Sequence, residues 1–299
     1  MMVTNTRQSL WQSLKTPWPN AEHSVFVTAA GIQWHIQHWV CASKPSIVLL
    51  HGTGSSSHSW AQLAPLLATE FDVLCIDLPG HGFTETGHHQ QASLTGMAQA
   101  VSGLLTTLGI APAMIAGHSA GAAIAIEMTL QGIVTPKYLV SINGALLPLS
   151  SPATAVFSPL AKVLAGNPIV PRLFSWQAGR DKPVRQLLKS TGSTVNQEMI
   201  NCYTQLVANP QHVSGALMMM ANWDLHPFEK KLIELKIPLC LIACSADKTV
   251  SPRQSAKVHQ QLGLTSTLEL LPNLGHLGHE ENPALFDSLI KNIFSKRPA

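Results

Sequence analysis

A serine with a glycine two positions away on either side is the feature of this sequence best suited to chemistry. Residues 117–121 read GHSAG and lie between an apolar run, residues 113–116, and a segment rich in helix formers, residues 122–130. A sharp turn from strand to helix strains the backbone at such a serine, and the glycines are needed because larger side chains would collide with the strand and helix. The pattern predicts that Ser119 is a nucleophile. A tight turn that merely needs small residues would look the same.

A serine hydroxyl attacks readily only when a base removes its proton and a third group orients that base. In a sheet of parallel strands these partners follow the serine in the order acid, then histidine, after the carboxyl ends of strands. Asp247 follows the apolar run 239–243, and we predict that it is the acid, the alternative being a turn aspartate bonded to its own backbone. His276 follows the run 267–271 after a bend, and we predict that it is the base.

His279, three residues further on, competes with His276 for the role of base. We favour His276 because it is nearer the end of the strand and directly follows the turn residue Gly275. Glu280 and Glu281 come just before the expected final helix, and we interpret them as charges that compensate its dipole.

Acyl transfer also requires hydrogen-bond donors that stabilise the developing oxyanion. Residues 51–54 read HGTG directly after the apolar run 47–50, and such a loop can aim a backbone N–H at a carbonyl oxygen. We predict that Thr53 is this donor and that the N–H of Ala120 is the second. The side chains that we expect to line the substrate site are His118, Met218, Met219 and Trp223.

Composition limits the classes of function that the chain can serve. With 299 residues, 45% hydrophobic and 12% charged, it can form one domain with an insertion, or two domains. The formal charge of +3 comes from 19 basic and 16 acidic residues without a basic stripe, which disfavours binding to nucleic acid. Residues 1–20 lack the apolar run of a secretory signal, so we expect a cytoplasmic protein.

Cysteine and histidine usage gives no sign of a disulfide framework, a metal site or a cofactor. The 5 cysteines are odd in number, and Cys75, Cys240 and Cys244 lie in apolar runs where a thiol packs as a small core residue. The 14 histidines include close pairs but no carboxylate or cysteine partners at the spacing of a zinc centre. We therefore expect neither a metal nor a cofactor.

Short apolar runs alternate with helix-like segments over most of the chain, which predicts an α/β fold. Buried strands separated by helices form a mostly parallel sheet with helices on both faces, here with about eight strands and an antiparallel edge from an initial hairpin. The expected strands are residues 25–28, 32–39, 47–50, 73–76, 113–116, 138–142, 239–243 and 267–271. The expected helices are residues 60–67, 97–108, 122–130, 255–262 and 284–294. Asp77 and His81 lie in a tight turn and are interpreted as structural.

Residues 145–234 interrupt this alternation with apolar helical stretches broken by prolines, and we predict that they form a helical cap over a core of residues 1–144 and 235–299. Lys162 is the sole charged residue between positions 145 and 171, but the prolines prevent a helix of the roughly 20 apolar residues that span a membrane. The cap either offers a surface to lipid or to an apolar ligand, or packs on the core.

Taken together, the HGTG segment, the turn at residues 77–82, the serine motif, Asp247 and His276 resemble the α/β-hydrolase superfamily over nearly the whole chain. The resemblance implies a Ser119-His276-Asp247 triad, backbone oxyanion donors at Thr53 and Ala120, and a cap that shapes the pocket. Haloalkane dehalogenases and epoxide hydrolases share the fold but carry an aspartate at the elbow, so Ser119 argues against both.

A narrower resemblance is to the magnesium-chelatase accessory proteins of bacteriochlorophyll biosynthesis. It rests on the core motifs and, above all, on two segments outside them, NGALLP at residues 143–148 and ANWDL at residues 221–225. The resemblance implies a role beside the chelatase that inserts Mg²⁺ into protoporphyrin IX during photosynthetic pigment synthesis. It does not imply the reaction.

Two classes of function follow. As an enzyme, the protein would cleave an ester of a small hydrophobic substrate, such as a porphyrin ester, through an acyl-enzyme; the same residues would also serve carbon–carbon bond hydrolysis or cofactor-free peroxidation. As a binding protein, it would carry a tetrapyrrole or associate with the chelatase without turnover. An apolar cap would suit a porphyrin and would also permit peripheral contact with a membrane.

Overall fold

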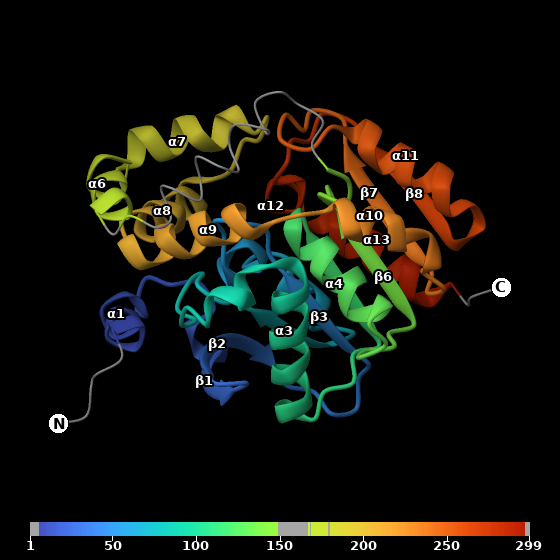
Figure 1. Cartoon of the computed structure of the whole chain (residues 1–299), viewed down its shortest axis with the longest axis horizontal. Helices are drawn as coiled ribbons and strands as arrows, with labels where there is room; N and C mark the ends of the chain where they lie inside the picture. Colours follow the sequence, from blue (N-terminus) through green and yellow to red (C-terminus); the bar gives the residue numbers. More distant parts are fainter. Residues whose placement is uncertain (1–5, 149–166, 168, 179, 297–299) are drawn as a thin grey trace.

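The centre of the molecule is an eight-stranded sheet in the order β1-β2-β4-β3-β5-β6-β7-β8 (Figure 1). The computed structural model describes residues 6–148, 167, 169–178 and 180–296. The strands are β1 (Ser24–Ala29), β2 (Ile32–Trp39), β3 (Ser46–Leu50), β4 (Asp72–Ile76), β5 (Met114–His118), β6 (Tyr138–Ile142), β7 (Leu239–Cys244) and β8 (Ser266–Leu271). Strand β2 pairs antiparallel with both β1 and β4, whereas all other neighbours are parallel. The predicted mostly parallel sheet with an antiparallel edge is confirmed.

Both faces of the sheet are buried because apolar side chains follow one another without a break along its central strands. In β3, Ile47 and Leu49 belong to one buried cluster, while Val48 and Leu50 belong to another. Successive side chains of a strand point to opposite faces, so one apolar run supplies both cores.

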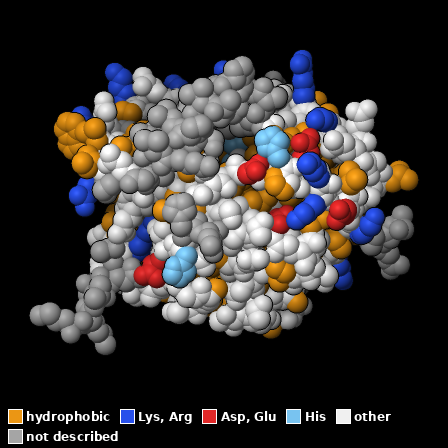
Figure 2. Space-filling model, in the orientation of Figure 1, with side chains coloured by type: hydrophobic (Ala, Val, Ile, Leu, Met, Phe, Trp, Pro, Cys, Tyr) orange, Lys and Arg blue, Asp and Glu red, His pale blue; other side chains and the backbone are white. Residues whose placement is uncertain are grey.

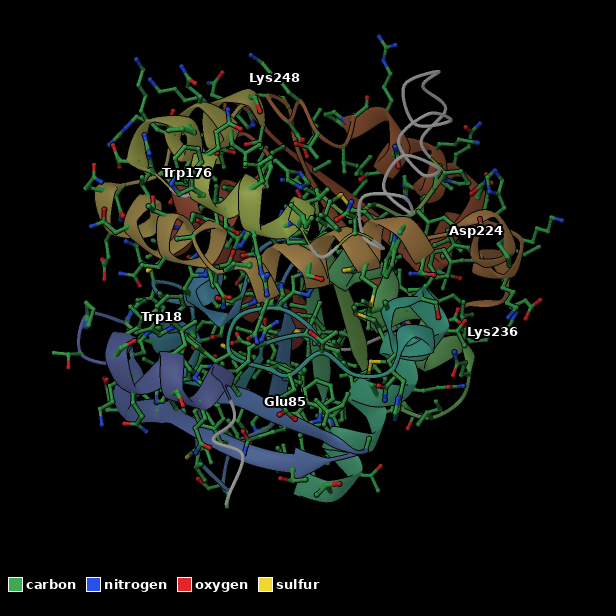
Figure 3. The ribbon with its side chains drawn as sticks, turned by 60° about the vertical axis from the view of Figure 1, so that its left-hand side comes forward. Trp18, Glu85, Trp176, Asp224, Lys236 and Lys248 are labelled. Carbon is green, nitrogen blue, oxygen red and sulfur yellow. The ribbon has the colours of Figure 1, made fainter. Side chains whose placement is uncertain are left out.

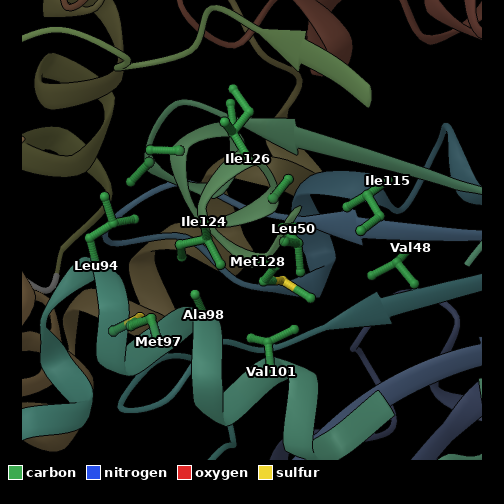
Figure 4. Packing of buried hydrophobic residues seen from close by; sticks show 14 of the residues in the cluster. Val48, Leu50, Leu94, Met97, Ala98, Val101, Ile115, Ile124, Ile126 and Met128 are labelled. Carbon is green, nitrogen blue, oxygen red and sulfur yellow. The ribbon is translucent and has the colours of Figure 1, made fainter. Parts of the chain in front are cut away.

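Helices cover the two faces of the sheet. One face packs on α3 (Leu94–Leu108), α4 (Ala120–Leu130) and α11 (Pro252–Leu262), and the other packs on α2 (Ala64–Leu67) and α13 (Pro283–Ser295). Figure 4 shows the first of these cores, where Val101 of α3 and Met128 of α4 lie close to Val48 of β3. The shorter helices are the 3-10 turns Ala21–His23, Ser57–Trp60, His89–Ala92, Leu232–Glu234 and Gly263–Thr265, together with α12 (Gly278–Glu281).

Several helix boundaries differ by one to four residues from the sequence-based expectation, and local residues explain two of these differences. Helix α3 begins at Leu94, three residues before the expected position 97, because the Ser93 side chain accepts a hydrogen bond from the N–H of Gly96. The single helix expected over residues 60–67 is instead a 3-10 turn ending at Trp60 and the short α2, which carries Pro65 in its first turn. Proline favours a helix start because it lacks an N–H to donate.

Among the described residues between β6 and β7 there are five α-helices. They are α6 (Ile169–Ala178), α7 (Asp181–Ser190), α8 (Gln197–Val207), α9 (Pro210–Asn222) and α10 (His226–Lys231). Figure 1 shows α6 to α9 as a layer beside the sheet, whereas Phe228 of α10 joins the core cluster of α3 and α4. Much of the apolar segment 145–176, including its residues 149–166, lies outside the described residues. The division into a core and a cap at residues 145 and 234 stays a proposal.

Helix α1 (Thr6–Leu14), which the sequence analysis did not predict, packs across the seam between the sheet and these helices. Arg7 donates to the carbonyl oxygens of Gly82 (2.5 Å), Gly80 (2.9 Å) and Gln211 (3.1 Å). Burial lowers the pKa of Arg7 to about 10, an effect that the nearby carboxylates oppose. The apolar side chains of the same seam are Trp11, Trp18, Phe83, Cys202 and Leu206.

Asp77, interpreted as structural, holds together the loops that follow β3 and β4. Its carboxylate accepts hydrogen bonds from the backbone N–H groups of Ser57 (2.6 Å) and Phe83 (2.9 Å) and from the His35 ring (2.8 Å). Burial by itself would raise the pKa of Asp77, but His35, His51 and the Phe83 N–H hold it well below its usual range. A side chain at Gly82 would collide with this carboxylate, since a Cβ there would lie 2.0 Å from Oδ2.

We expect Asp77→Asn to lower the free energy of unfolding by about 3 to 5 kcal/mol, because the amide removes the charge from a fully buried pair and offers an NH₂ where an acceptor is required. Urea unfolding followed by circular dichroism measures the loss. Asp181→Asn, at an exposed position on α7, is the matched control and should change stability by less than about 0.5 kcal/mol. Equal effects of the two substitutions would contradict the structural role of Asp77.

Candidate active site

Ser119 lies at the turn between β5 and α4. Its backbone angles, φ 53° and ψ −117°, are rarely adopted by residues other than glycine. The turn is possible because of the glycines around it. A Cβ at Gly117 would lie 2.4 Å from the backbone nitrogen of Ala122, and one at Gly121 would lie 2.2 Å from the carbonyl oxygen of Leu50. Ser119 itself is half-buried, so its side chain remains accessible.

Asp247 and His276 lie in hydrogen-bond contact after the ends of β7 and β8. The His276 Nδ1 to Asp247 Oδ2 distance is 2.7 Å. Asp247 Oδ1 accepts from the backbone N–H groups of Thr249 (2.7 Å) and Val250 (2.9 Å), which fixes the carboxylate in its turn. A carboxylate held in this way keeps the proton on Nδ1 and leaves Nε2 of His276 as the basic atom.

His279, the competing histidine, has no contact with Asp247. Its Nε2 lies 2.8 Å from Ser59 Oγ, and its ring packs on Trp60. Burial lowers the pKa of His279 to about 3, so the ring is neutral at physiological pH. Of the two histidines, His276 is therefore the one that contacts the predicted acid, whereas His279 is buried in the core.

The loop that carries His276 is held by residues that sequence reasoning missed. Asn143, just after β6, donates from Nδ2 to the carbonyl oxygens of His276 (2.8 Å) and Gly275 (3.1 Å) and accepts from the N–H of Cys244 (2.8 Å). Glu281 accepts from the N–H of Gly275 (2.8 Å). A sequence signal for Asn143 was its place directly after the expected strand 138–142, but that place does not reveal its partners.

His118, predicted to line the substrate site, instead lies beneath the His276 loop. Its Nε2 is 2.9 Å from the carbonyl oxygen of His276, to which it donates, and its ring centroid is 4.6 Å from those of His276 and His279. Burial holds the pKa of His118 well below its usual range, and its side chain is 2% exposed. This placement makes His118 a support for His276.

The predicted oxyanion donors flank Ser119. A Cβ at Gly52, next to Thr53, would lie 2.9 Å from the Cβ of Ser119, so the loop passes directly beside this serine. Ala120 is the first residue of α4, and its N–H therefore has no acceptor within the helix. These positions suit a pair of donors.

The three predicted cap residues lie in different surroundings. Met219 is fully buried, and its sulfur accepts a hydrogen bond from Thr53 Oγ1 at 3.3 Å. Met218 borders a small pocket beside Pro79, and Trp223 is half-buried against the core cluster of α3 and α4. Of the three, only Met219 touches the predicted oxyanion loop in the described part of the chain.

A buried polar cluster joins α8 to the loops around the site. The Glu280 carboxylate accepts hydrogen bonds at Oε1 from Tyr203 OH (2.7 Å) and from Ser59 Oγ, and Tyr203 OH also lies 3.2 Å from Ser55 Oγ. Glu280 Oε2 has no partner among the described residues. Burial raises the pKa of Glu280 to about 7, so the carboxyl group is not the exposed, dipole-compensating charge that its sequence position suggested. It is a buried link between two parts of the fold.

Glu280→Gln should reveal this titration as a pH-dependent difference in stability. The ordinary pKa of 4.5 applies to the unfolded chain, so between pH 4.5 and 7 the folded state retains a proton that the unfolded state loses. Wild type therefore loses stability relative to the glutamine variant as the pH rises. We expect the difference in free energy of unfolding, variant minus wild type, to increase by about 2 to 3 kcal/mol between pH 5 and pH 8.

Urea titrations of both proteins at several pH values measure this difference. Both proteins contain the same buried histidines, so the histidine contributions to the pH dependence of unfolding cancel. Glu269→Gln, on the exposed side of β8, is the matched control and should give no pH-dependent difference. A flat difference for Glu280→Gln as well would contradict the raised pKa.

Asn143→Asp preserves size but places an acceptor against two carbonyl oxygens. We expect it to lower the free energy of unfolding at pH 8 by about 2 to 3 kcal/mol, since two buried acceptors lose their donor. Urea unfolding measures the loss, and Asn201→Asp on the exposed side of α8 is the control. Stability equal to that of wild type would mean that the His276 loop does not depend on Asn143.

Neither a metal site nor a membrane-spanning helix is found in the described ranges of the chain. No group of three or more His, Cys, Asp and Glu side chains among those residues could hold a metal ion. No helix formed by them combines the length and the apolar character needed to cross a membrane.

The chain is similar in sequence to several known proteins. A sequence model of the alpha/beta hydrolase family matches residues 47–288. The magnesium-chelatase 30 kDa subunit of Rhodobacter capsulatus is 34% identical over 269 residues, which cover 90% of this chain and 93% of that protein. The uncharacterized hydrolase YugF of Bacillus subtilis (strain 168) is 26% identical over 89% of this chain and 96% of its own length.

Among solved structures, an esterase from Exiguobacterium antarcticum has a TM-score of 0.73 at 14% identity, covering 91% of this chain and 99% of the esterase chain. This likeness shows the fold, and the match of the family model agrees with it. The chain belongs to the alpha/beta hydrolase family and resembles the 30 kDa magnesium-chelatase subunit within it.

Proposed function

We propose that this protein is a serine-dependent hydrolase that acts as an accessory factor to magnesium chelatase in bacteriochlorophyll biosynthesis. The observation that carries the catalytic half of the proposal is the His276–Asp247 hydrogen bond of 2.7 Å. Asn143 and His118 hold the loop of His276, and His118 directly precedes the strained Ser119. The relative named as a chelatase subunit, similar over 90% of this chain, supports the accessory half.

The proposed reaction begins with attack of Ser119 Oγ on the acyl carbon of an ester. His276 Nε2 takes the serine proton while Asp247 stabilises the resulting imidazolium, and the N–H groups of Thr53 and Ala120 stabilise the oxyanion. His276 returns the proton to the leaving alcohol as the carbon–oxygen bond breaks, which leaves an acyl-enzyme. Water, deprotonated by His276, then releases the acid and restores Ser119.

The proposed substrate is a small hydrophobic ester, such as a porphyrin ester. Met219, fully buried against Thr53, makes the surroundings of the proposed oxyanion loop apolar and polarizable. Carbon–carbon bond cleavage or cofactor-free peroxidation would use the same three side chains, so the chemical class of substrate decides among these reactions.

A second candidate function is binding without turnover, as a tetrapyrrole carrier or a chelatase-associated protein. The observation that favours it is the name of the Rhodobacter capsulatus relative, which describes a subunit of the chelatase and no hydrolytic reaction. A fold can retain an active-site arrangement while serving another purpose.

Labelling with a fluorophosphonate probe tests the catalytic half. We expect wild type to be labelled, Ser119→Ala to remain unlabelled because the attacking oxygen is gone, and His276→Ala to react about 10² to 10⁴ times more slowly because the base is lost. The labelling rate is read by in-gel fluorescence on proteins whose circular dichroism matches wild type. The matched controls are Ser13→Ala and His226→Ala, both at exposed positions, which should label at the wild-type rate.

Folded wild type that resists the probe would overturn the hydrolase proposal. Titration with protoporphyrin IX and with its methyl esters, followed by tryptophan fluorescence, would then test the carrier function. Tight binding that survives Ser119→Ala, together with an absence of ester cleavage, would favour the second candidate.

A further inference from the structure

Helix α6 presents an exposed apolar surface at the outer end of the helical layer. The large hydrophobic side chains exposed on it are Ile169 (66%), Leu173 (57%), Phe174 (47%) and Trp176 (69%). Ser175 and Pro171 are buried on the inner side, where α6 packs against α9. Isolated exposed hydrophobic residues are ordinary on protein surfaces, but four on one ten-residue helix form a patch that indicates a binding surface.

Positive charge surrounds this patch. Five of the six charged residues between positions 169 and 190 are basic. The single acid, Asp181, pairs with Arg185 at 3.1 Å, and the guanidinium of Arg180 lies 5.6 Å from the Trp176 ring centre. Arg172, Lys182 and Lys189 have no ion pair with any described residue. Figure 2 shows hydrophobic atoms gathered at the left edge of the molecule, over α6, with Lys and Arg atoms around them.

We propose that the α6–α7 face, defined as the exposed side of residues 169–190, docks onto the surface of an anionic lipid bilayer. Aliphatic and aromatic side chains of an interfacial helix enter the boundary between headgroups and acyl chains, while Lys and Arg remain in the phosphate layer. The exposed Leu, Phe and Trp side chains of α6 fit the first layer, and the exposed cations Arg172, Lys182 and Lys189 fit the second.

A lipid surface fits this face better than a protein partner does. A stable protein interface buries about 800 Å² on each partner and needs a surface of complementary shape. A ten-residue helix with a few protruding side chains offers neither, whereas a bilayer adapts its shape to them. The helix is also about half the length of roughly 20 residues that would cross a membrane, so it can lie on the surface but not span it.

Docking through this face would orient the molecule. Figure 3 shows Trp176 at the opposite end of the helical layer from Asp224 and Lys236, so the latter end would point away from the lipid. Helix α6 packs on α9, and α9 carries Met219 against Thr53, so a single helix would separate the docked helix α6 from the predicted oxyanion loop. The inference does not depend on turnover at Ser119.

Co-sedimentation with large vesicles tests the proposal. We expect wild type to pellet with vesicles of phosphatidylcholine and phosphatidylglycerol in equal parts and to stay in solution with phosphatidylcholine alone, because the surface potential supplies much of the attraction. The paired substitution Leu173→Ser with Trp176→Ser should weaken binding by at least about 10-fold. Lys182→Ala with Lys189→Ala should weaken it by about 10- to 30-fold, and added salt should do the same.

Matched controls lie elsewhere on the surface. Leu264→Ser changes a side chain that is fully exposed after α11, and Lys230→Ala with Lys236→Ala removes two exposed cations near α10, so both variants should pellet as wild type does. Ser119→Ala should also bind unchanged, which separates this result from the test of hydrolysis. The proposal is overturned if wild type fails to pellet with the anionic vesicles, or if the α6–α7 variants bind as well as the controls.

Discussion

Three backbone segments meet around Ser119 at distances that leave no room for a Cβ atom, and the geometry of the site depends on this contact. Gly117 and Gly121 let the end of β5, the start of α4 and the end of β3 approach one another, and Gly52 brings the following loop beside the serine. The backbone of Ser119 is also fixed by hydrogen bonds to Ile142 and Ala145. Because the parallel strands β3, β5 and β6 all end at this point, the register of the sheet sets the position of Ser119.

His276 is held differently, by contacts from separate parts of the fold. Asn143 follows β6, Glu281 belongs to α12, and the carbonyl oxygen of Thr191, which precedes α8, accepts from the N–H of His276 at 3.3 Å. The helical layer therefore takes part in positioning His276. Tyr203 and Glu280 add a second, fully buried link between that layer and the loop after β3.

The sheet and the order of the candidate site residues could be predicted because they depend on local patterns. Apolar runs marked all eight strands to within two residues at their ends, and the turn residues after β7 and β8 marked Asp247 and His276. Asn143 and Tyr203 could not be found in this way, since each acts through partners far away in the sequence. Glu280 was interpreted as a solvent-exposed charge because nothing local shows that α8 covers it.

Helix α1 has a consequence for the order in which the chain folds. Arg7 is made early during synthesis, but its acceptors include Gln211, 204 positions later, so its contacts cannot be completed until α9 has left the ribosome. Contacts of such long sequence separation slow folding because the intervening chain must be ordered first. The segment that contains Trp11 would stay undocked until then, and docking of α1 would be among the last steps of native assembly.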